Sequence, residues 1–600
     1  MSINKRVASI LLLLIFCLTH SDALLAQTIN EMNKLIRVDV QTFMTESKIN
    51  HGYYVFRCKI QNFDSKSHKV TLSCDKVASK SFDLPASETI NASLPLPVTN
   101  PYFGNAVNIL VDNREVEHLY CPMRYNGAPF EHYYYTSYSH NDTTTLDNNA
   151  FMACRSLRRG LAEADCIFAE CDCKNWPQDR LDYSCLDFIL LTPLELSAAP
   201  AGVQTALRQF VSGGGILWLF DCEKQKEALD KIEWITQLKN DTNMNRKTAD
   251  TDKSHFSEYS LAFGRVFLFD FTPEEFLKQD GTENSNSDKN ILLDIYEYSG
   301  YRSFSDVSWF NRGILSEWQK KFPVVDDIGI PRAGILFVIF LFVLLAGPVN
   351  LFLLTKHNKR IWLLVTVPVL SFLFAGAILL YVTLSEGFKT ETRLCVIDYL
   401  DQRDGTYASM TQMGVYARTS PSNVTFDAED ELNIIERIKS DRLNIDWTSG
   451  KQVIHSTFAP VRNPAYYKIR KTGTSRLNLD FDFKAAYPYV VNGLGKDIEL
   501  LYVRDADGTL WKAENIGAGE KATLTFSNSL EETNYKTVSE FQSLISEPNW
   551  NVTASSLNKN PGNIPPNCYV AKFRSPGPFS NKGISYAIEK RTTAFLLGRF

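Results

Sequence analysis

The chain has 600 residues, of which 44% are apolar and 22% are charged, and its formal net charge is −5. One hydrophobic core organises about 250 to 300 residues at most, so several domains are expected. The composition is that of ordinary globular protein, and the absence of a basic excess excludes nucleic acid as an expected partner.

The first 26 residues have the layout of a secretory signal peptide. Lys5 and Arg6 precede an apolar run over residues 7–18, and small residues follow as far as Ala26. A positive start, an apolar middle and small residues before the cleavage site are the three parts of such a peptide. We therefore expect residues 1–26 to be removed on export, so that the mature chain begins outside the cytoplasm.

Residues 27–125 are predicted to form an immunoglobulin-like β-sandwich. Apolar and polar residues alternate in the segments Tyr53–Ile60, Lys69–Leu72 and Ala106–Val111, with turn residues between them. This period of two is typical of strands that bury one face. Cys58 and Cys74 could face each other across a hairpin, although spacing alone does not fix a disulfide pairing.

Residues 126–280 change to alternating strands and helices. Strands are predicted at 132–138, 166–170, 186–191, 216–220 and 264–270, and helices at 148–164, 201–211 and 228–238. Val203, Leu207 and Phe210 form one apolar stripe on the second helix, and the glycines at 213–215 end it. Such alternation predicts an α/β sheet with helices on both faces.

After a linker at 281–332, residues 333–354 and 361–384 are apolar runs that predict two transmembrane helices. The first contains 22 residues without a charge, and at about 1.5 Å per residue it can cross a hydrocarbon core of about 30 Å. The loop 355–360 between them carries Lys356, Lys359 and Arg360. Positive loops stay in the cytoplasm, so both flanking regions are expected outside it.

Three residues of the first span are candidates for packing within this hairpin. Pro348 lacks a backbone donor and is expected to kink the helix or let its neighbour approach closely. Asn350 is strongly polar and needs a partner in lipid, so it should face the second helix. Gly347 lies three residues earlier and should share that face.

Residues 385–600 are predicted to be β-rich, as one or two sandwich units outside the membrane. The expected strands include Arg393–Asp398, Gly414–Arg418 and Ile498–Val503, with a turn at Asp505–Gly508 after the last. Helices are expected to interrupt the strands at 428–441 and 537–544.

Three short segments carry a family resemblance: Leu186–Leu191, the glycine-rich Val211–Leu217, and Gly264–Val266. They resemble the class I glutamine-amidotransferase-like domain of bacterial membrane proteins. In that family the domain precedes a span ending in Gly-Pro-Val/Leu-Asn and then a second span, as it does here at Gly347–Asn350. The resemblance implies a flavodoxin-like α/β fold between the sandwich and the hairpin, and it implies a fold more readily than a function.

An amidotransferase needs a cysteine on a strand-to-helix elbow, a histidine base and an acidic residue that orients the base. Cys222 follows a predicted strand and precedes a predicted helix, but its neighbours are Asp221 and Glu223. Adjacent carboxylates raise the pKa of a thiol, whereas activation requires a lowered pKa. His255 and Glu258 form the nearby histidine–acid pair, with a spacing that departs from the family's His-x-Glu. We expect a scaffold or binding module rather than an enzyme.

Four cysteines lie close together in the sequence: Cys166, Cys171, Cys173 and Cys185. A zinc site is one interpretation, but a Cys-x-Cys pair lacks the usual ligand spacing, and an exported chain meets an oxidising compartment. Disulfides or buried thiols are the expected alternatives, and no cofactor is expected.

These patterns favour a non-enzymatic membrane protein of the cell envelope. Its expected partners are the lipid bilayer, which holds the hairpin, and an envelope protein or ligand bound by the outer domains, with a transporter component as one candidate. The alternative function is that of an exported amidase-like hydrolase.

Overall fold

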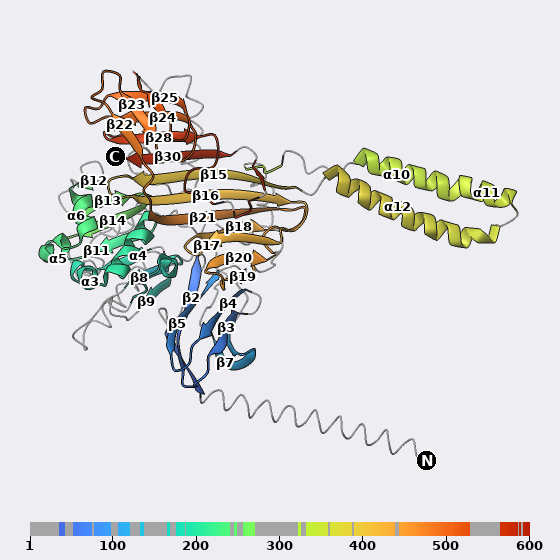
Figure 1. Cartoon of the computed structure of the whole chain (residues 1–600), viewed down its shortest axis with the longest axis horizontal. Helices are drawn as coiled ribbons and strands as arrows, with labels where there is room; N and C mark the ends of the chain where they lie inside the picture. Colours follow the sequence, from blue (N-terminus) through green and yellow to red (C-terminus); the bar gives the residue numbers. More distant parts are fainter. Residues whose placement is uncertain are drawn as a thin grey trace, which may run out of the picture.

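The computed structural model describes residues 35–41, 52–74, 77–97, 106–120, 133–136, 165–168, 176–186, 188–240, 245–248, 256–270, 322–325, 332–357, 360–386, 389–437, 443–455, 457–527, 564–581, 583–585, 587–589 and 592–600. Within these ranges a strand-rich body carries one projecting pair of long helices (Figure 1). We call the described parts of 35–120 the N-terminal lobe, of 133–270 the α/β lobe, of 332–386 the helical hairpin, and of 389–600 the C-terminal lobe.

The N-terminal lobe is a sandwich of two antiparallel layers. One layer has the order β1 (Ile36–Gln41), β2 (Tyr53–Asn62), β5 (Thr89–Pro97); the other contains β4 (Ala78–Leu84), β3 (His68–Cys74), β6 (Ala106–Val111) and β7 (Arg114–Tyr120). Their inward side chains share one core, as the predicted alternation requires. Because β2 and β3 belong to different sheets, the expectation that Cys58 and Cys74 face each other across a hairpin is wrong.

The second of these layers continues into the C-terminal lobe. Strands β19 (Ile445–Asp446), β20 (Lys451–His455) and β17 (Asn423–Asp427) extend it in the order β17-β20-β19-β4-β3-β6-β7. The joint is parallel, with Ile445 N donating to Val77 O at 3.0 Å and Trp447 N to Ser79 O at 2.8 Å. Segments before and after the helical hairpin therefore form one sheet.

The α/β lobe contains a seven-stranded mixed sheet in the order β12-β13-β14-β11-β10-β8-β9. Strands β8 (Tyr133–Thr136), β9 (Asp165–Phe168), β10 (Phe188–Leu191), β11 (Ile216–Leu219) and β14 (Gly264–Phe269) are parallel, whereas β12 (Asn245–Thr248) and β13 (Phe256–Leu261) add antiparallel pairs at one edge. The sequence did not predict β12 or β13, because their hairpin-like pairing interrupts the strand–helix alternation.

Short helices accompany this sheet: η2 (Arg180–Tyr183), α3 (Pro193–Ala198), α4 (Ala201–Ser212), α5 (Lys226–Asp230) and α6 (Glu233–Lys239). The apolar stripe of α4 is buried as predicted, and the helix packs against β11 and β14. A Cβ at Gly264 would collide with Val211 O, so glycine permits this close approach. The helix expected at 228–238 is two helices, α5 and α6, and the one expected at 148–164 lies outside the described residues.

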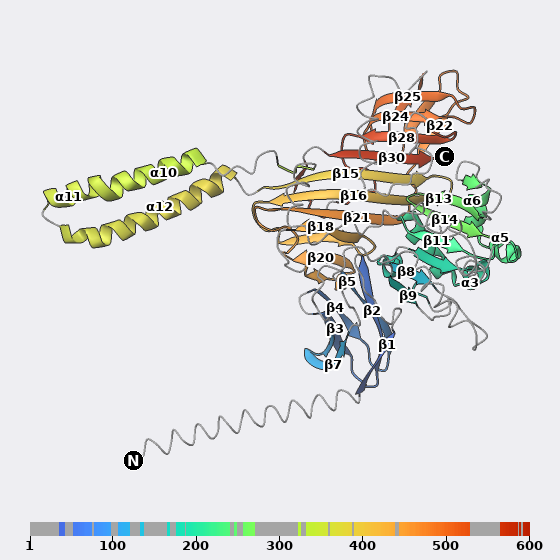
Figure 2. The ribbon, with the colours of Figure 1, turned by 180° about the vertical axis from the view of Figure 1, so that it is seen from behind.

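The helical hairpin consists of α10 (Arg332–Leu344), a π-helical turn η3 (Leu345–Val349), α11 (Asn350–Lys356), a short η4 (Arg360–Trp362) and α12 (Leu363–Glu386). Both arms are long and apolar enough to cross a membrane. They run side by side away from the body in both views (Figures 1 and 2). The π turn contains Pro348, where the missing N–H prevents regular α-helical bonding.

The C-terminal lobe is built on a ten-stranded sheet. It includes β18 (Glu431–Arg437), β21 (Pro464–Thr474), β16 (Thr406–Ala417), β15 (Thr390–Asp401), β30 (Thr593–Arg599), β28 (Cys568–Phe573), β24 (Ile498–Arg504), β25 (Leu510–Ile516), β27 (Thr525–Phe526) and the accessory β29 (Ile588–Glu589). A small sheet of β22 (Leu479–Asp482), β23 (Tyr489–Asn492) and β26 (Lys521–Thr523) lies beside it. The predicted turn at Asp505–Gly508 joins β24 to its antiparallel neighbour β25.

The helix expected at 428–441 is wrong, because residues Glu431–Arg437 form β18. Leu432 and Ile434 are buried two residues apart, which is the period of a strand, and β18 pairs with β21. Pairing with a neighbouring strand decides the conformation here and overrides local propensity. The helix expected at 537–544 lies outside the described residues.

Candidate functional site: a buried polar junction between three lobes

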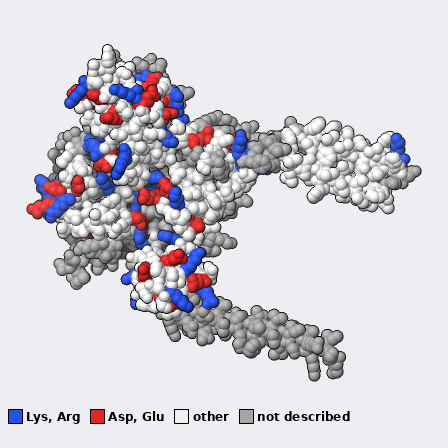
Figure 3. Space-filling view, in the orientation of Figure 1, with Lys and Arg blue, Asp and Glu red and all other residues white. Residues whose placement is uncertain are grey.

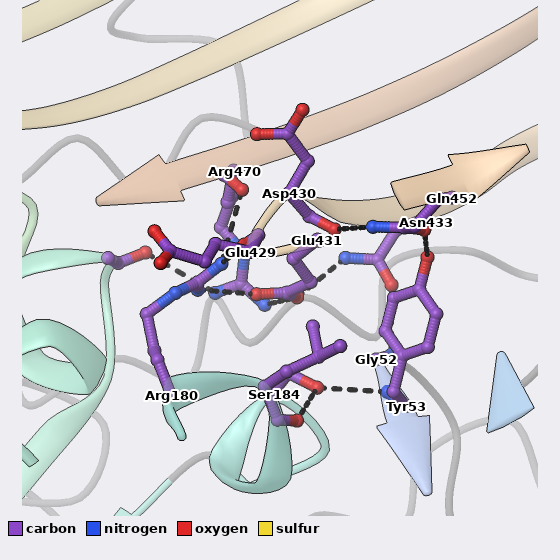
Figure 4. Close-up of polar contacts among 12 residues, drawn as sticks. Gly52, Tyr53, Arg180, Ser184, Glu429, Asp430, Glu431, Asn433, Gln452 and Arg470 are labelled. Carbon is purple, nitrogen blue, oxygen red and sulfur yellow. Dashed lines mark hydrogen bonds and ion pairs between the residues drawn. The ribbon is translucent and has the colours of Figure 1, made fainter. Parts of the chain in front are cut away.

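The three lobes meet at a cluster of buried polar side chains (Figure 4). The N-terminal lobe contributes the first residues of β2, the α/β lobe contributes η2 and the turn after it, and the C-terminal lobe contributes β18, β20 and β21. Its members come from positions as far apart as Tyr53 and Gln452, which are 399 residues apart in the sequence. We call this cluster the junction.

Its centre is a carboxylate held between two guanidinium groups. Arg180 Nη1 donates to Glu431 Oε2 at 2.9 Å, and Arg470 Nη2 donates to Glu431 Oε1. The same arginines also bind backbone carbonyls, with Arg180 Nη2 donating to Glu429 O at 2.9 Å and Arg470 Nη1 to Gly213 O at 3.4 Å. The α/β lobe and the C-terminal lobe are thus joined in both directions, by Arg180 from one and Arg470 from the other.

The arginines keep Glu431 ionised although the residue is fully buried. Burial alone would raise the pKa of Glu431, but Arg470 and Arg180 outweigh burial and hold the pKa below its usual value. Two cations and one anion share this site, so removing the anion would leave two buried cations without a counter-ion. Removing one member of a buried ion cluster is strongly destabilising, although the intact cluster adds little net stability compared with apolar packing.

Tyr53 connects the N-terminal lobe to the same cluster. Its hydroxyl donates to Gln452 Oε1 at 2.7 Å, and its backbone N–H donates to Ser184 Oγ at 2.9 Å. The preceding Gly52 N donates to Asn433 Oδ1 at 2.9 Å, and Asn433 Nδ2 donates to Glu431 Oε1 at 2.8 Å. A continuous chain of hydrogen bonds therefore runs from the N-terminal lobe to the central carboxylate.

Glycine is required at the first step of this chain. Gly52 has φ +72°, a backbone conformation that residues other than glycine rarely adopt, and an added Cβ would collide with Ser184 O. The backbone of the N-terminal lobe approaches the α/β lobe closely at this point.

A second ion pair joins the N-terminal and α/β lobes nearby. Arg57 Nε donates to Asp182 Oδ1 at 2.8 Å and Nη2 to Asp182 Oδ2 at 2.6 Å, a two-point contact. Burial raises the pKa of Asp182 to about 6, although Arg57 acts in the opposite direction. This pair is ionised at neutral pH and weakens in acid.

The polar groups of the junction connect the three lobes through hydrogen bonds and ion pairs. Both oxygens of Glu431 and the amide of Gln452 are engaged in hydrogen bonds. In the part of the chain that the structure describes, no group of three His, Cys, Asp or Glu side chains could hold a metal ion. The arrangement orients the lobes and resists their separation.

The structure places Cys222 directly after β11, in a buried turn. Its Sγ donates to Leu219 O at 3.3 Å, and burial, with Asp270 adding to it, raises the pKa of the thiol to about 12. Within this turn, Asp221 has a left-handed backbone conformation, with φ +61°. Glu258 is buried in β13 with Arg265 Nη1 3.6 Å from Oε1, and His255 lies outside the described residues.

The cysteines considered for zinc are only partly described. Cys166 lies in β9, and Cys185 is buried after η2 with its Sγ 3.9 Å from Asp182 O. Cys171 and Cys173 lie outside the described residues. Cys185 therefore lies at the edge of the junction, next to the residue that pairs with Arg57.

In the hairpin, Asn350 faces α12 and Gly347 does not. Asn350 is buried, and its Nδ2 donates to Thr366 Oγ1 at 2.8 Å. Pro348 and Gly347 are exposed, and a Cβ added to Gly347 would meet nothing within 4 Å, which differs from the expected shared face. The π turn explains the difference, because its extra residue per turn rotates Gly347 relative to Asn350.

Sequence reasoning did not find Arg180, Glu431 or Arg470. Arg180 and Glu431 are 251 residues apart, and no local periodicity relates such positions. The sequence contains only a weak signal for these residues. Glu431 and Arg470 are charged residues that stand next to apolar residues in strands.

Comparisons with known proteins do not assign this chain to a family. No family model matches the chain, and no curated protein matches it. Among solved structures, a fragment of native α2-macroglobulin from Escherichia coli, spanning domain MG7 to the C-terminus, is 9% identical, with 81% of this chain and 98% of that chain covered. Its TM-score of 0.12 is too low to support any statement about fold or function.

Proposed function

We propose that this chain is a non-enzymatic membrane protein of the cell envelope, anchored by the helical hairpin, whose three-lobe body lies outside the cytoplasm and binds a protein partner or ligand. The observation that carries the proposal is the contrast between an exposed apolar hairpin and a body whose sheet joins the segments on either side of that hairpin. A component of a transporter or envelope complex is one candidate partner.

The surface of the hairpin supports a membrane location. Large apolar side chains such as Phe340, Leu364 and Phe372 are 65%, 78% and 82% exposed. Figure 3 shows this arm without charge along most of its length and with positive charge near its tip. An apolar surface of this extent is typical of a membrane or partner interface.

The shared sheet supports a hairpin that crosses twice. Because β19 is hydrogen-bonded to β4, the segments before and after the hairpin lie on one side of any membrane, and the tip with Lys356 and Arg360 lies on the other. Positively charged loops remain in the cytoplasm, which favours a body outside it. This argument is independent of the signal peptide.

We further propose that the α/β lobe is a flavodoxin-like, amidotransferase-like domain retained as a scaffold. Support comes from the parallel order β9-β8-β10-β11-β14, which follows the flavodoxin-like order 2-1-3-4-5. The buried thiol of Cys222, with its raised pKa, disfavours the thiolate that an amidase-like hydrolase would need.

Cysteine labelling in intact cells tests the topology. We expect a membrane-impermeant maleimide to label Asp507→Cys, in an exposed turn of the C-terminal lobe, and to label Asn358→Cys only after permeabilisation. The unsubstituted chain gives the background from native cysteines. Labelling of Asn358→Cys in intact cells would show that the proposed orientation is wrong.

Complementation with Cys222→Ser tests the absence of catalysis. Cys58→Ser is a matched control, because it also replaces a buried thiol. We expect both variants to retain biological activity. Loss of activity in Cys222→Ser alone, at a normal protein level, would favour the hydrolase.

A further inference from the structure

Residues Ser575–Asn581, between β28 and β29, cross one face of the large sheet of the C-terminal lobe. Gly577 and Phe579 are buried, whereas Pro576 and Pro578 are only partly covered. The Phe579 ring stacks on Tyr407 of β16 with ring centroids 4.2 Å apart. We call this segment the strap, since one of its sides packs on the sheet and the other meets solvent.

A buried carboxyl lies beneath the middle of the strap. Asp398, three residues before the end of β15, is completely buried, and its Oδ2 accepts a hydrogen bond from Phe579 N at 3.5 Å. Gly577 lies so close that an added Cβ would collide with the same oxygen. The Ser409 side chain also hydrogen-bonds to this carboxyl, but among the residues that the structure describes Oδ1 has no partner of its own and no cation pairs with the group.

A second buried carboxyl holds the end of the strap. Asn581 Nδ2 donates to Asp430 Oδ2 at 3.1 Å, and Asp427 N donates to the same oxygen at 3.0 Å. Lys471 Nζ lies 3.5 Å from Asp430 Oδ1, so this carboxyl has a cation where Asp398 has none. Asp430 precedes Glu431, which places the end of the strap next to the junction.

The charges around the two carboxyls differ accordingly. Across the sheet from Asp398 lie Ser409 on β16 and apolar Leu596 on β30, with Lys471 on β21 in register with Ser409, and Tyr407 is two residues further along β16, opposite Leu400. Asp430 interacts with Asp427, Lys471, Tyr407 and Tyr53, and its chain neighbours Glu429 and Glu431 are also acidic. Lys471 is already paired with Asp427 and Asp430, so it does not neutralise Asp398.

We propose that the strap is a pH-responsive clasp: it stays closed while Asp398 is protonated, loosens when Asp398 ionises, and thereby changes its hold on Asp430 beside the junction. An ionised carboxylate without a cation can recover solvation only if water reaches it, and the strap covers it. Burial raises the pKa of Asp398 to about 7, with Ser409 and the Phe579 N–H opposing, which places the transition near neutrality.

Hydrogen exchange of the full-length protein in detergent tests this inference. Strap amides, including the Phe579 N–H, should lose protection between pH 5.5 and 8.5, after correction for intrinsic exchange rates. The expected loss is at least about tenfold, because one unit of pKa corresponds to a tenfold change in the equilibrium between the closed and open strap. Asp398→Asn cannot ionise and should keep its protection constant over the range. Asp401→Asn, on the same strand but paired with Arg403, should behave like the unsubstituted protein.

A second variant keeps the test valid if Asp398→Asn fails to fold. The hydrogen bond from Ser409 favours the ionised carboxyl, so Ser409→Ala should move the midpoint of strap opening to higher pH. Flat protection in the unsubstituted protein, an unchanged midpoint in Ser409→Ala, or an unchanged pH dependence in Asp398→Asn would each overturn the inference.

Discussion

Glu431 and Asp398 are two fully buried carboxyl groups in the same lobe, yet their pKa values shift in opposite directions. Glu431 lies between two arginines, and its pKa is below the usual value. Asp398 has no cation among the described residues, and burial raises its pKa to about 7. Burial penalises charge at both sites, so the presence of a partner decides which group stays ionised.

The two sites therefore have opposite effects on stability as pH changes. Glu431 has a lowered folded pKa, so its contribution is present above the unfolded pKa and is lost as pH falls through the folded value. Asp398 has a raised folded pKa, so the folded state binds its proton more tightly than the unfolded chain does. Stability from this group is present in acid and is lost as pH rises from about 4 towards about 7.

Glu431→Ala should have the largest effect, because it leaves Arg180 and Arg470 buried without their anion. We expect a loss of about 3 to 5 kcal/mol in the free energy of unfolding, measured by denaturant titration at pH 7. Glu429→Ala is the matched control, since Glu429 is exposed and contributes its backbone carbonyl to Arg180. Equal losses in the two variants would contradict the central role of Glu431.

Asp398→Asn should have a smaller effect of opposite sign. At pH 8 the substitution removes an uncompensated buried charge, and we expect the free energy of unfolding to rise by about 2 kcal/mol, half of what the full pKa shift corresponds to. At pH 5 the folded carboxyl is protonated while the unfolded one is already ionised, so only a smaller part of this gain is expected. A gain of the same size at both pH values would show that ionisation of Asp398 is not its cause.

Tyr53→Phe tests the contact between the N-terminal lobe and the junction. It removes the hydroxyl that donates to Gln452 Oε1 and leaves a buried acceptor unpaired. We expect a loss of about 1 kcal/mol in the free energy of unfolding. Tyr487→Phe is the control, because Tyr487 is 79% exposed and should tolerate the change. An unchanged Tyr53→Phe would mean that this hydroxyl adds nothing to the joint.

Sequence patterns predicted the elements whose stabilising contacts are local. The alternation in β2, the apolar stripe of α4 and the two apolar runs of the hairpin each repeat within a few residues, so periodicity reveals them. The joint between β4 and β19 connects segments more than 360 residues apart, as the bond from Ser81 N to Thr448 Oγ1 shows. Separate sandwiches were therefore expected where one sheet is shared.

The junction was unpredictable for a related reason. A charged residue in a strand normally indicates a solvent-facing position, and Glu431 was also placed in a helix. Only the three-dimensional proximity of Arg180 and Arg470 makes a buried Glu431 favourable. The polar groups whose partners are remote in sequence are those that local propensity assigns wrongly.

The hairpin offers the smallest test of the same rule, since Asn350 is a buried polar group with one uncharged partner, Thr366. We expect Asn350→Leu to cost about 0.6 kcal/mol, the typical value for interhelical hydrogen bonds in membranes. Thr366→Val should cost a similar amount, and the double variant should cost no more than either alone, because both remove one bond.

Gly347→Leu is the control for this cycle, and its expected effect reverses the one that sequence spacing suggests. Sequence spacing places Gly347 against the second helix, where a leucine would separate the helices. In the structure the π turn moves Gly347 away, and a Cβ at this position would meet no atom within 4 Å, so leucine should be tolerated. Detergent unfolding, followed by the loss of disulfide formation between Phe342→Cys and Phe374→Cys, whose native rings lie 5.5 Å apart across the two arms, measures these changes. Additive costs in the double variant would show that Asn350 and Thr366 do not act through one bond, and a large cost for Gly347→Leu would return Gly347 to the helix interface.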